Sequence, residues 1–172
     1  AETGPEMLPR LRVALANTYV TAREVGRGGL ATVYIGRDIR HDRPVAIKVL
    51  HPEIAASMGS ERFLREIRLA ATLQHPHILG LYDSGDLGGL LYYVMPYVEG
   101  ESLRERLDRE RQLPIEEAIR HATSIASALD YAHRLQSVHR NVTAATAMLY
   151  DGQAMVMDVG MAREVAAALA EQ

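Results

Sequence analysis

Residues 25–48 constrain the fold more than any other part of this chain. The stretch reads V-G-R-G-G-L-A-T-V-Y-I-G-R-D-I-R-H-D-R-P-V-A-I-K and ends at Lys48, the only lysine among 19 basic residues. Because all other basic side chains are arginine, a position that tolerated either would be expected to carry arginine, and Lys48 indicates a need for a compact ammonium group. The glycines upstream lack a Cβ, so their backbone N–H groups can come close to an anion. The apolar residues around them predict strands on both sides of a glycine turn.

Length and composition are those of one packed domain or slightly more. The chain has 172 residues, 48% of them hydrophobic, and a formal net charge of -3, which gives no case for a nucleic-acid or membrane partner. Cysteine is absent, which excludes disulfides and thiolate metal sites and fits a cytoplasmic protein. No apolar run reaches membrane-spanning length, and no signal-peptide pattern is present. We expect residues 1–18 to be a tag or N-terminal extension.

The remaining pattern predicts an α+β chain. Strands are expected at residues 19–25, 32–37, 45–50, 79–82 and 90–95, and residues 8–17 form either a helix or a strand. An amphipathic helix is expected at residues 61–71 with Ser60 as its N-cap, and another helix from Glu101 onward. A long helix is expected from Ile115 to Leu135, with a core stripe of Ile115, Ile119, Ala122, Ile125 or Ala126, Leu129 and Ala132. His121 and His133 are expected to be packing or surface residues and not ligands.

Two motifs together resemble a known family. G-R-G-G-L-A-T-V at residues 26–33, followed by V-A-I-K at residues 45–48, resembles the glycine-rich loop and third-strand lysine of bacterial, eukaryotic-type (Hanks-type) Ser/Thr protein kinases. A glycine-rich turn alone also occurs in ordinary hairpins, but its coupling to V-A-I-K is specific. The third glycine of the family pattern is Ala31 here. The resemblance implies a kinase-like fold with a five-stranded antiparallel N-lobe and one helix at 19–95, a hinge at 96–99 and a partial, mainly helical C-lobe at 100–172.

The resemblance also implies a nucleotide site. Glu66 falls where the family pairs a carboxylate with the lysine, although a solvated helix charge beside Arg62 is the alternative. In the hinge, Pro96 offers only a carbonyl and Val98 keeps its N–H, which suits the acceptor and donor edge of adenine. Ser102 falls where the family often places a ribose contact. The implied nucleotide-binding residues are Val25, Gly26, Gly28, Gly29, Val33, Ala46, Lys48, Glu66, Met95, Pro96, Tyr97, Val98 and Ser102.

The predicted catalytic loop departs from the family. Residues 139–146 read H-R-N-V-T-A-A-T where the family has H-R-D-L-K-x-x-N, so Asn141 replaces the catalytic aspartate, Thr143 the lysine and Thr146 the metal-binding asparagine. A carboxamide does not accept a proton as a carboxylate does, and a threonine hydroxyl is a different metal ligand. Asp158 begins a D-V-G sequence that resembles D-F-G. It is therefore a possible Mg²⁺ ligand, with Thr146 as a weak second one, and we expect Mg²⁺ binding to be weakened but not lost.

These observations predict that the chain binds ATP or ADP with phosphoryl transfer disabled, as a natural pseudokinase or as an engineered minimal fold. Two alternatives stay open: an interaction or scaffold module that holds no nucleotide, and a residually active kinase fragment. The chain stops soon after the D-F-G-like motif, before the family's later C-lobe helices. We therefore expect the apolar stripe of the long helix to face water and to form a homodimer, with the alanine-rich tail at 163–170 covering part of it.

Overall fold

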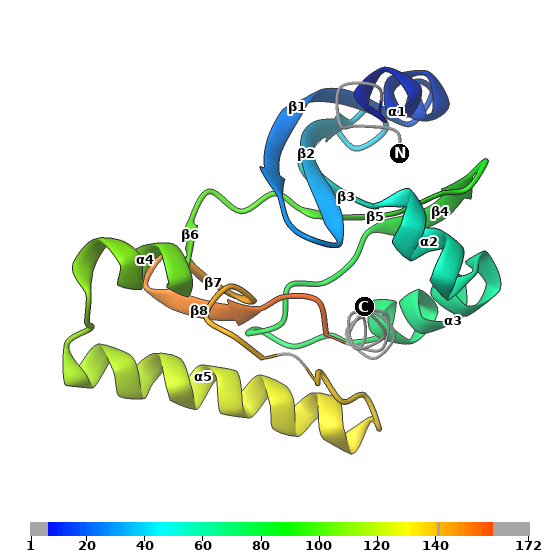
Figure 1. The fold of residues 1–172 in the computed structure, drawn as a ribbon. Coiled ribbons are helices and arrows are strands. Elements are labelled where there is room, and N and C mark those ends of the chain that lie inside the picture. The colour runs from blue at the N-terminus through cyan, green and yellow to red at the C-terminus, as the bar shows by residue number, and fades with distance from the viewer. Residues whose placement is uncertain (1–6, 141, 160–172) are drawn as a thin grey trace. The chain divides into compact units, whose positions relative to one another are not determined.

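The computed structural model describes residues 7–140 and 142–159, which form two compact units. Among the described residues, unit 1 comprises 7–65 and 81–97, and unit 2 comprises 66–80, 98–140 and 142–159 (Figure 1). Residues 1–6, Asn141 and the expected tail helix at 163–170 lie outside the described residues. The lobe and hinge limits given above stay predictions.

Unit 1 contains the expected antiparallel five-stranded sheet. Its strands are β1 (Tyr19–Arg27), β2 (Ala31–Asp38), β3 (Arg43–Leu50), β4 (Asp83–Leu87) and β5 (Leu90–Pro96), in the order β1-β2-β3-β5-β4. The prediction of a strand at 79–82 was wrong, because β4 begins only at Asp83 and has a polar sequence, DSGDL. The apolar residues before it divide between the two units: the Leu79 N–H donates to Val156 O at 2.9 Å in unit 2, and the Tyr82 N–H donates to Val94 O at 2.8 Å in unit 1.

Helix α1 (Met7–Leu15) covers one face of this sheet. Met7, Leu11 and Leu15 recur every four residues and are all buried in the cluster that contains the side chains of that sheet face, as expected for an amphipathic helix. Arg12 donates to the carbonyls of Thr21 and Ala22 at 3.0 and 2.6 Å, where the pairing of β1 with β2 shifts register. Of the two alternatives for residues 8–17, the structure therefore has the helix.

Two helices follow β3. Helix α2 (Pro52–Met58) was not predicted, because seven residues are too few to establish a helical period, and helix α3 (Ser60–Ala71) matches the predicted amphipathic helix. The expected N-cap was wrong. Ser60 is the first residue of α3, and its hydroxyl donates to the Asp86 carboxylate on the β4 strand. The short link at Gly59, whose φ is 78°, leaves no separate cap residue between the two helices.

Unit 2 combines helices with a small sheet. Its strands β6 (Glu101–Ser102), β7 (Ala147–Tyr150) and β8 (Gln153–Val156) pair in that order, and its helices are α4 (Leu103–Glu110) and α5 (Ile115–Arg134). The β7–β8 hairpin was missed. Its turn is Asp151-Gly152, both with positive φ, and Asp-Gly between apolar residues is a sequence signal for a tight hairpin. None of the helices within 7–140 and 142–159 combines the length and hydropathy needed to cross a membrane.

Helix α5 leaves most of its apolar stripe exposed, as expected for a stripe that faces water, and buries another face. Small and polar residues face the core, which also contains Leu73, Ile78 and Val156. Of the predicted core stripe only Ala132 is buried, whereas Ile115 and Ile119 are 79% and 60% exposed. Small side chains let the β8 strand lie close to the helix, which explains why the larger apolar residues are excluded from this contact. The buried positions of α5 are His121, Ser124, Ala128 and Ala132.

Asp38 organises the turn between β2 and β3. Its carboxylate is buried and accepts hydrogen bonds from the backbone N–H groups of Arg40 and His41, from the His41 ring and from the Arg43 guanidinium. Burial opposes ionisation of this carboxyl, but the hydrogen bonds from His41 and Arg43 outweigh it and lower the pKa of Asp38 from 3.8 to about 2. The ionised carboxylate therefore stabilises the folded state.

This predicts a defined pH dependence of stability. Because the folded-state pKa is depressed, the contribution of Asp38 is fully present above pH 3.8 and is lost as the pH falls through about 2. We expect Asp38→Asn to lower the melting temperature by several degrees at pH 7, and the difference from the parent chain to shrink toward pH 2. Asp42→Asn is the matched control, because the Asp42 side chain is 83% exposed and, among the described residues, pairs with Arg37 alone. Equal melting temperatures of Asp38→Asn and the parent at pH 7 would contradict this assignment.

Candidate functional site

The register of the unit 1 sheet aligns the predicted site residues. Val33 on β2 is paired with Lys48 on β3, and Lys48 is paired with Tyr93 on β5. Two residues along, Ile35, Ala46 and Met95 form a second row across the same strands. Because side chains alternate between the two faces of a sheet, these two rows share one face. The structure thus brings Val33, Ala46, Lys48 and Met95 together.

The opposite face of the sheet is occupied by core residues. Tyr34, Val45, Ile47, Val49, Tyr92 and Val94 alternate with the site residues and pack with α1. The strong apolar signal of β3 and β5 therefore has two origins, since one set of side chains forms the core under α1 and the other surrounds Lys48. Lys48 Nζ lies 5.8 Å from the centroid of the Tyr93 ring, within the range of a cation–π contact.

The glycine turn joins β1 to β2. Gly26 is paired with Val33 and Arg27 with Thr32, after which the Gly28 N–H donates to Ala31 O at 2.9 Å. A Cβ at Gly26 or Gly29 would meet no atom within 4 Å, and one at Gly28 would meet only Ala31 O at 3.8 Å. The chain itself therefore does not require glycine here for steric reasons. The glycines leave open space beside the backbone, as a phosphate group needs.

Other residues predicted to contact the nucleotide form hydrogen bonds with nearby groups of the protein. The Tyr97 N–H lies 3.5 Å from Pro44 O, and Val98 O accepts a hydrogen bond from Gly100 N–H. Ser102 is the N-cap of α4 in a capping box with Glu105, in which the Glu105 N–H donates to Ser102 Oγ at 3.2 Å. The role of Ser102 as a ribose contact stays a prediction. Its capping of α4 already explains why a serine occupies this position. Glu66 lies in unit 2 and Lys48 in unit 1, so their pairing also stays a prediction.

In the predicted catalytic loop, two threonine hydroxyls form hydrogen bonds with the backbone of the loop itself. Thr146 Oγ1 accepts from Thr143 N–H at 2.9 Å and donates to Thr143 O at 3.1 Å, while Thr143 Oγ1 accepts from Ala145 N–H. Side-chain oxygens that bond to nearby backbone in this way stabilise turns. Both threonine hydroxyls thus have structural roles. Asn141, at the expected catalytic position, lies outside the described residues.

Backbone bonds hold this loop next to the D-V-G sequence. Thr146 O accepts from Met157 N–H at 2.8 Å, and the buried His139 donates from Nε2 to Met157 O at 2.6 Å. Arg140 and Asp158 have φ values of 64° and 60°, a region that non-glycine residues enter mainly where the surrounding structure holds them. The bond between Thr146 and Met157 therefore holds one position expected to bind a metal, Thr146, next to the segment that contains the other, Asp158.

Comparisons with known proteins agree with this geometry. The family model described as protein kinase domain matches residues 19–170. The chain belongs to the protein kinase family. Among curated relatives it is 41% identical over 155 residues to a probable serine/threonine-protein kinase of Streptomyces coelicolor, and 37% identical over 158 residues to serine/threonine-protein kinase PknB of Mycobacterium leprae. These alignments cover 87% and 88% of this chain but only 23% and 25% of the relatives, so the chain spans about a quarter of their length.

Solved structures give the same result for the fold. The kinase domain of Mycobacterium tuberculosis PknI is 36% identical, with a TM-score of 0.77, over 85% of this chain and 59% of that one. The fold is therefore that of a protein kinase, with the five-stranded sheet as its N-lobe and a partial helical C-lobe. The resemblance drawn from the glycine turn and V-A-I-K is confirmed.

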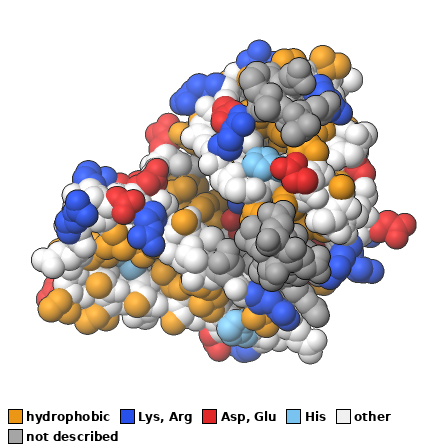
Figure 2. Space-filling model, viewed as in Figure 1, with side chains coloured by type: hydrophobic (Ala, Val, Ile, Leu, Met, Phe, Trp, Pro, Cys, Tyr) orange, Lys and Arg blue, Asp and Glu red, His pale blue; other side chains and the backbone are white. Residues whose placement is uncertain are grey.

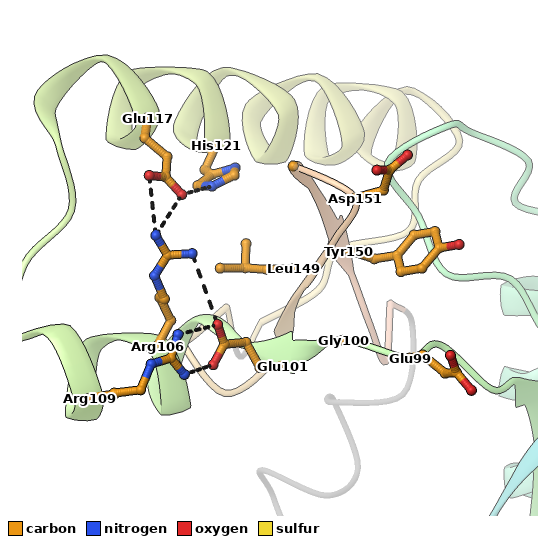
Figure 3. A pocket seen from close by; sticks show the side chains of 11 residues that line it. Glu99, Gly100, Glu101, Arg106, Arg109, Glu117, His121, Leu149, Tyr150 and Asp151 are labelled. Atoms are coloured by element: carbon orange, nitrogen blue, oxygen red, sulfur yellow. Dashed lines mark hydrogen bonds and ion pairs between the residues drawn. The ribbon is translucent and has the colours of Figure 1, made fainter.

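Unit 2 of this kinase chain also has a cavity of about 430 Å³ that the sequence did not indicate (Figure 3). Glu101, Arg106, Arg109, Glu117 and His121 line it together with the β7–β8 turn. Arg109 and Arg106 pair with Glu101, and Arg106 also pairs with Glu117 at 3.3 Å. The His121 ring contacts Glu117 through Nε2 at 3.3 Å, whereas its buried Nδ1 has no hydrogen-bond partner within the described part of the chain.

This cavity is explained by packing between elements of unit 2. The hydrogen bond from Arg109, acting against partial burial, lowers the pKa of Glu101, and Arg106 has the same effect on Glu110. The charged groups thus form ion pairs that join β6, α4 and α5 (Figure 3). Acidic residues outnumber basic ones around the cavity, so its field disfavours phosphate groups. The candidate nucleotide site of this chain is therefore the glycine turn and the Lys48 face.

Proposed function

We propose that this chain binds an adenine nucleotide, ATP or ADP, and that its capacity for phosphoryl transfer is disabled. The observation that carries the proposal is the single sheet face of unit 1 that presents Val33, Ala46, Lys48 and Met95 next to the open glycine turn. Apolar side chains with one well-placed cation are what a purine and its phosphates require. α1 and the core occupy the other face.

Each remaining residue of the site has a defined task in this proposal. Val25, Val33, Ala46 and Met95 contact the purine, Pro96 O and the Val98 N–H bind its edge, and the N–H groups of the glycine turn bind phosphate. The Lys48 ammonium neutralises phosphate charge, Glu66 orients Lys48, and Ser102 adds a ribose contact beyond its capping role. An ATP-dependent role places the chain in the cytoplasm, where ATP is available. The backbone contacts to the nucleotide come from Gly26, Gly28, Gly29 and Tyr97, in addition to the groups just named.

The Mg²⁺ site fits less well. Within residues 7–140 and 142–159 no group of three or more His, Asp and Glu side chains could hold a metal ion. Asp158 contributes one carboxylate, and Thr146 Oγ1 is already bonded to Thr143. Mg²⁺ in proteins commonly uses one or two carboxylates together with substrate phosphates and water. Asp158 would therefore hold Mg²⁺ only weakly, and mainly with the phosphates of the nucleotide.

Loss of transfer follows from the loop at 139–146. Asn141 provides a carboxamide where the family has a carboxylate, and Thr143 provides no positive charge. A kinase depends on such groups to orient the attacking hydroxyl and to balance charge on the phosphoryl group. The bonded threonine hydroxyls leave the loop without a group that replaces either function.

Nucleotide binding is tested by thermal stability. At an ATP or ADP concentration of about 100 times the dissociation constant, the folded state should gain about 2.7 kcal/mol. Lys48→Ala should remove most of this gain, and Lys48→Arg should remove part of it, because a guanidinium does not replace a compact ammonium. Arg40→Ala removes an exposed cation from the β2–β3 turn, at the end of β2 opposite the glycine turn, and is the control that should change nothing. An unchanged melting temperature of the parent chain in millimolar Mg-ATP would exclude nucleotide binding and favour the scaffold alternative.

Phosphoryl transfer is tested with radiolabelled ATP and a peptide substrate. We expect the parent chain to give only background incorporation, since loss of a general base alone lowers rates by about 10²- to 10⁴-fold. Incorporation well above background that disappears in Lys48→Ala would instead support a residually active kinase. Asn141→Asp restores only the carboxylate, and we expect little recovery from it because Thr143 and Thr146 are unchanged.

We also propose that the 172-residue chain forms a homodimer through α5. Exposed apolar residues lie along this helix, and Figure 2 shows hydrophobic side chains over the α5 side of unit 2. Ile115 and Ile119 expose most of their surface. Ala118, Ala122 and Ala126, which lie at helical spacing from them, are exposed as well. A contiguous apolar face of this kind usually marks an interface. A second copy offers the same face, as a two-fold dimer requires.

Light scattering at micromolar to near-millimolar concentration tests the dimer. The parent chain should be dimeric, and Ile119→Glu should be monomeric because it places a charge within the apolar face. Arg120→Glu changes an adjacent exposed position outside the face and should remain dimeric. A parent chain that is monomeric over the whole range would rule out the proposal.

A further inference from the structure

His51 contacts the glycine turn with three polar groups. It directly follows β3, and its backbone N–H donates to Leu30 O at 2.8 Å. Its ring Nδ1 lies 3.2 Å from Gly29 O, and its Nε2 lies 3.1 Å from Thr32 Oγ1. A carbonyl can only accept, so Nδ1 must carry the hydrogen that it shares with Gly29. The Thr32 hydroxyl can either donate to Nε2 or accept from it, so both ring contacts form in either protonation state.

The position of His51 in the chain does not by itself explain a histidine. His51 is the N-cap of α2, a position that favours Ser, Thr, Asp or Asn because their side chains cap the helix. The His51 ring makes no such bond; its carbonyl instead accepts from the N–H groups of Ile54 and Ala55. The imidazole is therefore directed at a turn 22 residues away in sequence and not at its own helix.

The turn has few contacts of its own. The β1–β2 pairing ends at Arg27 and Thr32, and the Gly28 N–H to Ala31 O bond closes the turn beyond it. Gly28 and Gly29 have no side chains that could pack, and glycine loses more conformational entropy on ordering than any other residue. Contacts from outside the turn are thus needed to fix its conformation, and His51 supplies them at Gly29, Leu30 and Thr32.

A fixed carbonyl also fixes the N–H group of the same peptide unit. In a trans peptide the C=O and the following N–H point in opposite directions, and no cis peptide bond occurs among the described residues. With Gly29 O bonded to the His51 ring, the Leu30 N–H must point away from that ring. Oriented backbone N–H groups in glycine turns are binding sites for anions.

We propose that His51 is a positioning residue for the phosphate groups of the nucleotide: by holding Gly29 O, it aims the Leu30 N–H at a phosphate oxygen. This inference rests on the proposed nucleotide binding. β3 and the residue that follows it then provide two parts of the phosphate site, the Lys48 ammonium and, three residues later, the His51 side chain that orders the turn. The ordering is present before the nucleotide arrives, which lowers the entropy lost on binding.

The test compares ligands with and without phosphates. Dissociation constants of ATP, ADP and adenosine are measured by calorimetry for the parent chain, His51→Ala, His51→Asn and His133→Ala. We expect His51→Ala to weaken ATP and ADP by about three- to tenfold, as one or two neutral hydrogen bonds would, and to leave adenosine unchanged. Asn places an amide N–H near the Nδ1 position and should retain most of the affinity. His133 is exposed on α5, so His133→Ala should have no effect.

A second measurement needs no ligand. Hydrogen exchange of the backbone amides of residues 28–31 should be faster in His51→Ala than in the parent chain, and close to the parent rate in His51→Asn. Unchanged exchange would show that the ring does not order the turn and would overturn the inference.

The outcomes separate this inference from the proposed function. If the parent chain binds ATP and His51→Ala leaves its affinity unchanged, or weakens adenosine equally, the positioning role is wrong while nucleotide binding stands. If the parent chain binds adenosine as tightly as ATP, the phosphates are not contacted and the inference falls, although the purine site remains. If the parent chain binds neither, both the proposed function and the role of His51 in phosphate positioning are wrong.

Discussion

The antiparallel pairing of β2 with β3 is the constraint on which the candidate site depends. Val33 lies opposite Lys48, and the strict alternation of side chains then places Ala46 and Met95 on the Lys48 face and Val45, Ile47 and Val94 on the core face. A shift of one residue in this register would bury the ammonium under α1 and expose the core. Stability of the core and placement of the single lysine are therefore determined by the same ladder of hydrogen bonds.

Prediction from sequence succeeded where a motif and a period coincided. Four strands of the N-lobe, α3 and the kinase family were all predicted from alternation and from the spacing of the glycine turn to V-A-I-K. It failed where the signal came from another contact. Residues 79–82 divide between the units, with Leu79 bonded to β8 and Tyr82 bonded to β5, and β4 is polar although it is a strand. The β7–β8 hairpin does have a signal in the sequence, the Asp151-Gly152 dipeptide of its turn.

Helix α5 shows why periodicity alone does not identify the buried face. Its large apolar residues repeat correctly, yet Ala128, Ala132, Ser124 and His121 are the residues that face the core. Close approach of the β8 strand favours small side chains, and a sequence pattern gives weight to large ones. The contacts of His51 with the glycine turn are equally hard to read from sequence, because a histidine after a strand has no period and its partners lie about 20 residues earlier.

The departures that remove catalytic and metal-binding groups of the kinase pattern fall in one segment, residues 139–146, and their physical effect is more than the loss of three groups. Thr146 and Thr143 have not simply replaced an asparagine and a lysine; their hydroxyls bond to the backbone of the same turn and close it. A metal ion at Thr146 would have to compete with the Thr143 N–H for the same oxygen, and the turn would lose that bond if the ion won. The loop is thus stabilised in a form that does not depend on a bound ion or substrate, whereas the glycine turn and the Lys48 face of unit 1 keep the groups that a nucleotide needs. Retained binding groups in unit 1 and a self-bonded loop in unit 2 both support the proposal of nucleotide binding without phosphoryl transfer.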